Sequence, residues 1–276
     1  PMTDPATTDD SHEPATDDSN EPATDDSNEP ATDDSNEPAT DDSHEPATDE
    51  STEGSPPDQP TVTPDAVAGE VDYERLLERF GADPLTDDQI RRFPDHPMLR
   101  RRVFYAGRDV DRYLDAAESG DTHSIVTGVG PSGPMHLGHV LVFYLARRLQ
   151  AATGAHVYVP LSDDEKFYAK DLSFAEIAAA TRDNLRDLLA VGFDPERTRI
   201  VVDRLDAGAL YPQAARVAGG VTQSTVDATY GDPENIGRSF YPAMQATHLL
   251  LPQLVHGRHP TLVPVAVDQD PHVRVC

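Results

Sequence analysis

The sequence contains a single cysteine in 276 residues, and it is the final one, Cys276. An internal disulfide is therefore impossible, and nothing indicates an oxidising compartment. No apolar run reaches the ~20 residues that a membrane-spanning helix needs. The first residues are acidic, whereas a secretory or organelle-targeting segment would be basic. These absences argue against membrane insertion and export, and we expect the protein in the cytoplasm.

Lysine is also scarce. Lys166 and Lys170 are the two lysines among 22 basic residues, in a chain with a formal net charge of -28. Residues 1–60 contain 20 of the 50 acidic residues and no basic one, so the remainder carries 22 − 30 = −8. Acidic excess with few lysines resembles the proteins of salt-loving archaea, although GC-rich codon usage has the same effect on lysine. In such a chain, two lysines within five residues suggest a chemical role.

An acidic octapeptide, Pro-Ala-Thr-Asp-Asp-Ser-Asn-Glu, repeats from residue 14 to residue 45, with His44 replacing asparagine in the fourth copy. Its units have no side chain larger than alanine to bury, so folding cannot offset their loss of conformational entropy. We predict that residues 1–68 are a disordered tail. An acidic interaction segment and a solvating tail are the functional alternatives.

Residues 69–123 are predicted to form an extension of helices and a short strand. Apolar spacing predicts a helix over residues 71–80, which Gly81 ends. Thr86 and Gln89 form a candidate capping box for a second helix. We expect a basic turn and a strand over residues 97–107 and a helix over residues 109–118. The arginines at 100–102 are interpreted as a solvated turn or as partners of the acidic surface, with a polyanion site as the alternative.

Residues 124–276 alternate between short apolar strands and helices. This alternation predicts a doubly wound α/β domain with a parallel sheet. The expected strands lie at residues 124–127, 154–161, 199–203 and 261–267, and the expected helices at residues 140–150, 174–191, 211–230 and from 239 onward. Ligands of such sheets bind beyond the carboxyl ends of the strands. Four loops should therefore converge there: residues 128–139, 162–166, the loop after Asp203, and residues 268–270.

The glycine-rich loop from Gly128 to His139 joins the first of these strands to a helix. Unpaired backbone N–H groups and the helix dipole favour an anion at a helix start, where His136 and His139 would flank it. Gly138 permits a flat ring to approach the backbone closely. The loop lacks the spacing of P-loop and dinucleotide-binding motifs, so nucleotide binding through histidines is the favoured interpretation. A metal site and a simple helix cap are the alternatives.

The segment Pro131-Ser-Gly-Pro-Met-His-Leu-Gly-His139 resembles the HIGH motif of class I aminoacyl-tRNA synthetases, a pattern that related nucleotidylyltransferases share. Three further segments resemble the tryptophanyl-tRNA synthetases of archaea and eukaryotes. They are Ser162-Asp-Asp-Glu-Lys166, Phe240-Tyr-Pro-Ala-Met-Gln245 and Val267-Asp-Gln-Asp-Pro-His-Val-Arg274. Together with the segment at residues 104–109, the similarity runs from about Val71 to Cys276.

This resemblance implies that tryptophan attacks the α-phosphorus of ATP and that the adenylate then esterifies tRNA(Trp). His136 and His139 are the implied catalytic donors to the phosphate. The implied ATP-binding residues are Gly128, Gly130, Ser132, Gly133 and Gly138. The implied amino-acid-binding residues are Glu165, Lys166, Gln245 and Gln269, with Asp268 and Asp270 beside them. Mg²⁺ is expected with ATP, without a dedicated protein site. DNA is not an expected partner. The resemblance also implies a homodimer, because synthetases of this family are commonly dimers.

Two positions depart from the family pattern. Val126 and Pro160 align where eukaryotic relatives place a tyrosine and a glutamine against the indole nitrogen. Neither side chain accepts a hydrogen bond, and a buried donor without a partner costs about 1–3 kcal/mol. Another acceptor or a water must then serve, or the amino acid is tyrosine.

A third departure is the lysine-containing KMSKS loop, which class I synthetases place after these motifs and which has no counterpart beyond Lys170. Residues 124–276 thus resemble the first part of a catalytic domain, and we expect a C-terminally truncated chain. Three functions remain open: a tryptophan–tRNA ligase, a tyrosine–tRNA ligase or other adenylyl-transferring enzyme, and an inactive fragment that binds nucleotide or tRNA.

Overall fold

A computed structural model describes residues 61–63, 66–68 and 81–276. The octapeptide repeats and the helix expected over residues 71–80 lie outside these ranges. Within the predicted tail, β1 (Thr61–Thr63) and β2 (Ala66–Ala68) form an antiparallel pair in which Val62 lies opposite Val67. The β-branched side chains of threonine and valine favour this extended conformation. The prediction of a disordered tail over residues 1–68 falls mostly on residues outside the described ranges and stays a prediction.

Between residues 81 and 123, the chain forms two short strands and three helices. They are β3 (Asp83–Pro84), α2 (Asp87–Arg92), α3 (Pro97–Arg100), β4 (Ala106–Gly107) and α4 (Val110–Ser119). The predicted capping box of α2 is confirmed, because Gln89 N donates to Thr86 Oγ1 and Thr86 N donates to Gln89 Oε1. The basic turn expected at residue 97 is instead the helix α3, since Pro97 suits the first helical turn and His96 caps it.

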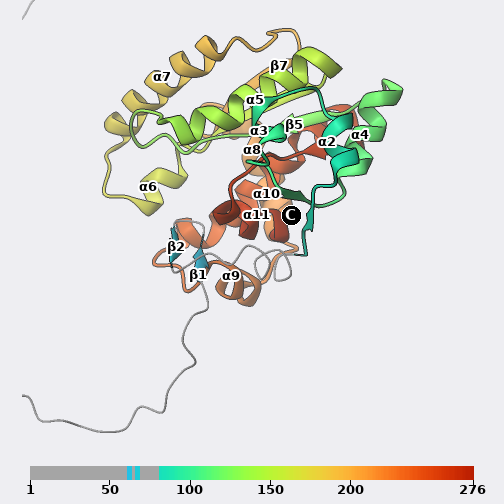
Figure 1. Cartoon of the computed structure of the whole chain (residues 1–276). Helices are drawn as coiled ribbons and strands as arrows, with labels where there is room; N and C mark the ends of the chain where they lie inside the picture. Colours follow the sequence, from blue (N-terminus) through green and yellow to red (C-terminus); the bar gives the residue numbers. More distant parts are fainter. Residues whose placement is uncertain (1–60, 64–65, 69–80) are drawn as a thin grey trace, which may run out of the picture. The chain divides into compact units, whose positions relative to one another are not determined.

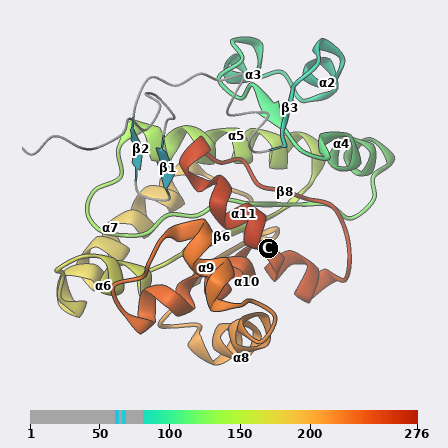
Figure 2. The ribbon, with the colours of Figure 1, turned by 90° about the horizontal axis from the view of Figure 1, so that it is seen from below.

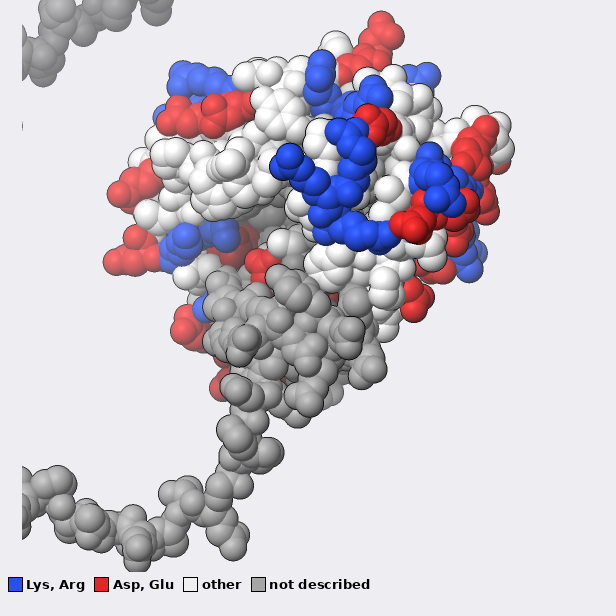
Figure 3. Space-filling view, viewed as in Figure 1, with Lys and Arg blue, Asp and Glu red and all other residues white. Residues whose placement is uncertain are grey.

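Arginines and acidic side chains alternate over α2, α3 and α4. Arg100 pairs with Asp95, and Arg102 pairs with Asp87. Figure 3 shows basic and acidic side chains next to one another on this face. The interpretation of these two arginines as partners of the acidic surface is therefore confirmed.

A four-stranded parallel sheet organises the remaining chain (Figure 1). Its strands are β5 (Ser124–Val126), β6 (His156–Leu161), β7 (Thr198–Val202) and β8 (Thr261–Leu262), in the order β7-β6-β5-β8. β6 is apolar along its length, as expected of a strand that is covered on both faces. The predicted β-α-β unit is confirmed, and the direction of strand order changes at β5.

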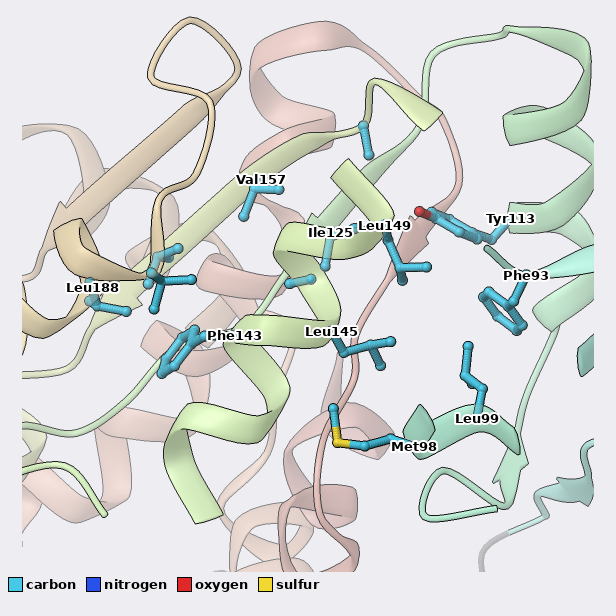
Figure 4. Close-up of a cluster of buried hydrophobic side chains, with 14 of the residues drawn as sticks. Phe93, Met98, Leu99, Tyr113, Ile125, Phe143, Leu145, Leu149, Val157 and Leu188 are labelled. Atoms are coloured by element: carbon cyan, nitrogen blue, oxygen red, sulfur yellow. The ribbon is translucent and has the colours of Figure 1, made fainter. Parts of the chain in front are cut away.

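Helices cover both faces of the sheet. They are α5 (Leu137–Thr153), α6 (Glu165–Ala169), α7 (Phe174–Val191), α8 (Ala207–Ala218), α9 (Gln223–Tyr230) and α10 (Ile236–His256), followed by η1 (Val267–Gln269) and α11 (Asp270–Val275). Figure 2 shows α10 and α11 on the side of the sheet opposite α5. In the core between the sheet and α5, Phe143 and Leu149 pack with Ile125 and Val157 (Figure 4). The predicted doubly wound α/β fold is thus confirmed.

Three details differ from the sequence-based prediction or extend it. The strand expected over residues 261–267 ends at Leu262, and Pro264, which lacks a backbone N–H, follows two residues later. Leu189, an apolar residue near the C-terminal end of α7, is 66% exposed. α10 continues through Pro242 and Pro252. Among the described residues, no helix has the length and apolar character needed to cross a membrane.

Candidate functional site

The loop over residues 128–139 lies against the carboxyl end of β6. Val129 N donates to the carbonyl of Pro160 at 3.1 Å, and Ser162 N donates to the carbonyl of Val129 at 3.2 Å. Val129 and Leu161 form a parallel bridge. The loop that follows β5 thus continues the sheet, and this brings two of the four predicted loops together.

Two glycines make this close approach possible. A Cβ atom on Gly128 would lie 2.3 Å from the carbonyl oxygen of Pro160. A Cβ atom on Gly130 would lie 2.1 Å from Cε of Lys166 and 3.0 Å from Oε2 of Glu165. These separations are shorter than van der Waals contact, so any larger residue would displace the strand end or the lysine. The approach of the loop to β6 therefore requires glycine at position 128, whereas a side chain at position 130 would displace the end of Lys166.

Both lysines of the chain lie against the glycine-rich loop. Lys166 Nζ lies 2.6 Å from Glu165 Oε2, and both side chains are largely shielded from solvent. Lys170 Nζ donates to Ser132 Oγ at 3.0 Å. The positive charges therefore lie beside the glycine-rich loop, where an anion would meet them.

His136 and His139 stack at the start of α5. Their ring centroids lie 3.8 Å apart at an interplanar angle of 20°, and His136 N donates to His139 Nδ1 at 3.4 Å. Partial burial lowers the pKa of His139, and the positive charges of His136 and Lys166 lower it further. An anion bound here would oppose that repulsion and gain the field of a 17-residue helix.

The other two predicted glycines differ in their surroundings. A Cβ atom on Gly138 would lie 3.1 Å from the imidazole of His136, so glycine leaves room for this ring. A Cβ atom on Gly133 would meet nothing within 4 Å, and its carbonyl accepts a hydrogen bond from Asn184 Nδ2 at 2.8 Å. The packing thus requires glycine at position 138 more than at position 133.

Gln245 lies in α10 one turn after Tyr241, and the phenol of Tyr241 connects Gln245 to Ser162 after β6. Tyr241 Oη lies 2.8 Å from Gln245 Oε1 and 3.1 Å from Ser162 Oγ. Burial raises the pKa of Tyr241 well above its usual value, and the carboxylate of Glu165 raises it further. Gln245 and Glu165, both predicted to bind the amino acid, therefore approach the same phenol from different elements.

Gln269 ends η1 and precedes α11. Gln269 Nε2 donates to Asp268 Oδ2 at 3.1 Å. Asp270 pairs with Arg108 and with Arg274, which holds α11 against the segment before β5. Two residues later, His272 packs edge-on against Tyr241, with ring centroids 6.1 Å apart.

A buried set of polar groups behind these residues was not found from the sequence. It consists of the buried side chains of Asp164 in the segment after β6, Asp203 directly after β7 and His248 on α10, together with the partly buried Tyr211 on α8. His248 Nε2 lies 2.7 Å from Asp203 Oδ1, and both side chains have no solvent exposure. Tyr211 donates to Asp164 Oδ2 at 2.7 Å.

Burial dominates the electrostatics of this set. It raises the pKa of Asp164 and of Asp203 to about 7 in each case, because a charged carboxylate is poorly solvated there. It lowers the pKa of His248 to about 4 for the same reason. The strand-end position of Asp203 was a signal in the sequence. The position of His248 within an apolar helix gave no such signal.

Val126 and Pro160 are buried in β5 and β6. Val126 packs with Tyr158 and Leu249, and the carbonyl of Pro160 already accepts from Val129 N. Neither side chain supplies an acceptor for an indole N–H, as the sequence predicts. Within the described ranges, no group of three or more histidine, cysteine, aspartate or glutamate side chains is arranged to hold a metal ion.

The chain matches the family model of class I tRNA synthetases (W and Y) over residues 118–208. It is 66% identical over 215 residues to Tryptophan–tRNA ligase 2 of Halobacterium salinarum, with 78% of this chain and 56% of that protein covered. It is 41% identical over 223 residues to Tryptophan–tRNA ligase of Pyrobaculum calidifontis, with 78% and 60% covered. The chain thus spans between half and two thirds of the length of these relatives.

Solved structures agree with this match. Tryptophanyl-tRNA synthetase of Plasmodium falciparum superposes with a TM-score of 0.70 at 32% identity, with 74% of this chain and 63% of that chain covered. The enzyme of Trypanosoma brucei superposes with a TM-score of 0.67 at 33% identity, with 74% and 67% covered. The sequence matches and the structural superpositions agree, and the chain belongs to the class I tRNA synthetases of the W and Y family.

Proposed function

We propose that this chain carries the amino-acid activation site of a tryptophan–tRNA ligase. In the first reaction, a carboxylate oxygen of tryptophan attacks the α-phosphorus of ATP, and pyrophosphate leaves. In the second, the adenylate transfers the aminoacyl group to the 3′ end of tRNA(Trp). The observation that carries the proposal is the contact of the glycine-rich loop with Glu165 and Lys166.

The loop supplies the groups that the phosphates need. Negative charge grows on the α-phosphate as the attacking oxygen approaches, and each well-placed donor lowers such a barrier by about 3–4 kcal/mol. His136 and His139 stand at a helix start where backbone N–H groups point toward the same region. Gly138 leaves the approach to these N–H groups open. Lys166 adds positive charge 2.6 Å from Glu165.

The amino-acid side of the site uses acceptor groups. Glu165, Gln245 and Gln269 are proposed to bind the ammonium group of tryptophan, as the family resemblance implies. Support comes from Tyr241, which lies beside Glu165, hydrogen-bonds to Gln245 and packs against His272 of α11. Since Val126 and Pro160 offer no side-chain acceptor, we propose that the indole N–H is met by another group or by water.

Mg²⁺ would enter with the phosphates of ATP, which supply most of its ligands and share their charge with it. The acidic chain does not attract a polyanion by its net charge. Contact with tRNA(Trp) would therefore depend on arginine side chains at short range, above all at high salt. We also propose that the protein acts in the cytoplasm.

Amino-acid-dependent exchange between ATP and pyrophosphate tests the proposal. The chain has no tryptophan, so fluorescence excited at the red edge of the indole band comes from added tryptophan alone and reports its binding independently. Binding of tryptophan together with tryptophan-dependent exchange would support the proposal. Exchange with tyrosine in place of tryptophan would reassign the substrate. ATP binding without affinity for either amino acid would contradict the activation site.

A further inference from the structure

A series of polar contacts runs from α8 through the segments after β6 and β7 to Gln245 on α10. Tyr211 Oη donates to Asp164 Oδ2. The carboxyl of Asp164 interacts with that of Asp203, and Asp203 Oδ1 lies 2.7 Å from His248 Nε2. His248 Nδ1 lies 3.3 Å from Gln245 Oε1. This series of contacts thus ends at Gln245, a side chain that is proposed to bind the substrate.

The chemistry of the donors fixes the direction of these bonds. Oε1 of Gln245 only accepts, so Nδ1 of His248 must carry hydrogen to bond with it. A neutral imidazole with hydrogen on Nδ1 has a bare Nε2, which must accept a proton from the carboxyl of Asp203. The alternative is a cationic His248 that faces the carboxylate of Asp203. This pair holds the same number of protons, and Nδ1 of His248 still carries its hydrogen.

Two of the buried oxygens that have no hydrogen-bond partner among the described residues belong to this set and fit this arrangement. They are Asp164 Oδ1 and Asp203 Oδ2, one on each member of the carboxyl pair. Two buried carboxyls can satisfy these atoms by sharing a proton, as in other carboxyl pairs. In the fully protonated state, every group from Tyr211 to Gln245 then has a partner without a net charge being buried.

Loss of a proton from the Asp203–His248 pair reverses the last bond. Asp203 then accepts from Nε2–H, and Nδ1 is a bare acceptor that faces Gln245 Oε1. Two acceptors repel, so the carboxamide turns and presents Nε2 to the imidazole. Its oxygen then faces away from His248. An ammonium group requires that oxygen, which in the protonated state already accepts from His248 and Tyr241.

We propose that Asp203 and His248 are positioning residues for Gln245: the proton held by this pair decides which end of the carboxamide faces the amino-acid site. This inference rests on the proposed binding of tryptophan and adds a regulation of that site by pH. Tryptophan binding favours the deprotonated pair, and by linkage it releases a proton.

The groups that surround the pair come from four parts of the chain: the segments after β6 and β7, and the helices α8 and α10. Their charges bias the pair, and among them Tyr241 also donates to Gln245. From the segment after β6 come Asp163, Asp164 and Glu165; after β7 come Arg204, which pairs with Asp163, and Asp206; α8 and α10 add Tyr211 and Tyr241. The imidazole of His248 is the group that contacts both Asp203 and Gln245.

Two substitutions at His248 separate the two contacts. In His248→Asn, the shorter amide lies where Nδ1 was and offers either a donor or an acceptor to Gln245, without titrating. In His248→Gln, the amide extends to the place of Nε2, so contact with Asp203 is kept and contact with Gln245 is lost. Thr247→Val is the matched control, because Thr247 is equally buried on α10 and its hydroxyl donates to the carbonyl of Ala243.

Tryptophan affinity is measured by indole fluorescence with the full chain at pH about 6 and about 8. A pair that titrates near pH 7 is deprotonated in about one-tenth of molecules at the lower pH and about nine-tenths at the higher. The wild type and Thr247→Val should therefore bind about tenfold more tightly at the higher pH. His248→Asn should bind with less than about a twofold pH effect. His248→Gln should bind about three- to tenfold more weakly than wild type at the higher pH.

The imidazole tautomer is a second measurement that needs no substrate. Nitrogen chemical shifts of His248 should show Nδ1–H at the lower pH and Nε2–H at the higher. One unchanged tautomer, or a His248→Asn variant with the wild-type pH response, would overturn the inference. If the wild type binds no tryptophan at either pH, the proposed function fails, and the tautomer alone decides whether the proton controls Gln245.

Discussion

Gly130 lies so close to Lys166 that a single methyl group on the glycine would reach within 2.1 Å of the lysine Cε. The segment after the carboxyl end of β6 and the loop after β5 therefore meet at Lys166, whose Nζ lies 2.6 Å from Glu165 Oε2. This contact links the proposed phosphate side of the site to the proposed amino-acid side.

Substitution of this glycine should uncouple the two sides. In Gly130→Ala, Lys166 must move, and its pairing with Glu165 changes. We expect the exchange of ATP with pyrophosphate to fall at least about tenfold, in line with the cost of overpacking a tight contact. Gly133→Ala is the matched control, because a methyl group there meets nothing within 4 Å. Equal losses in both variants would show that the contact at Gly130 is not the cause.

The stacked histidines should act on the rate more than on amino-acid binding. His136→Asn and His139→Asn each remove an imidazole that the proposed mechanism directs at the α-phosphate. The exchange rate should fall about 10²–10³-fold, the usual loss for one transition-state donor. Affinity for tryptophan, measured by indole fluorescence, should stay within about twofold. His156→Asn, at the opposite end of β6, serves as the control and should leave the exchange rate unaffected.

The carboxyl pair predicts how stability depends on pH. The folded chain raises the pKa of Asp164 to about 7, so it keeps a proton that the unfolded chain releases near pH 4. This contribution to stability is fully present below the unfolded pKa and is lost as pH rises through the folded pKa.

Asp164→Asn should remove this loss, because the amide imitates the protonated carboxyl: it accepts from Tyr211 and donates to Asp203. Between pH about 4 and about 7, the free energy of unfolding of the variant should rise relative to wild type by on the order of 1 kcal/mol per pH unit. Urea unfolding at fixed salt concentration measures it. A difference that does not change with pH would mean that Asp164 titrates normally.

The capping box of α7 gives a prediction that concerns stability alone. Glu176 N donates to Ser173 Oγ at 3.3 Å, and Ser173 N donates to Glu176 Oε2 at 2.8 Å. Ser173→Ala should lower the free energy of unfolding by about 0.5–2 kcal/mol without a specific effect on tryptophan affinity. Glu176→Gln keeps an acceptor for Ser173 N and should cost less. If Glu176→Gln is the more damaging change, the hydroxyl is not the main cap.

Local patterns were sufficient to predict the elements around the site. β-branched residues before Gly128 and an apolar helix after His139 predict β5 and α5, and the buried run ending at Leu161 predicts β6. Parallel strands then place their carboxyl ends at one edge, so the meeting of Gly130 with Lys166 follows in outline. The distance between these two residues does not follow from the sequence, because it depends on how the side chains of the two loops pack.

Other features depend on contacts that no local pattern contains. α3 forms because Pro97 and His96 suit a helix start, although the arginines that follow indicate a turn. His248 lies among apolar residues of α10, and its partner Asp203 is 45 residues away in sequence. A buried polar residue shows its role only when the acceptor across the fold is known.

The two prolines inside α10 have a mechanical consequence. Pro252 has no N–H to donate to the carbonyl of His248, and Pro242 precedes Gln245 by three residues. The turn that carries Gln245 and His248 is thus bounded by two points where the helix lacks an internal hydrogen bond. A bend at these two points breaks no helical hydrogen bond there, so the short helical segment between Pro242 and Pro252 can change its direction relative to the two ends of α10. Gln245, which is proposed to bind the substrate, lies in that segment.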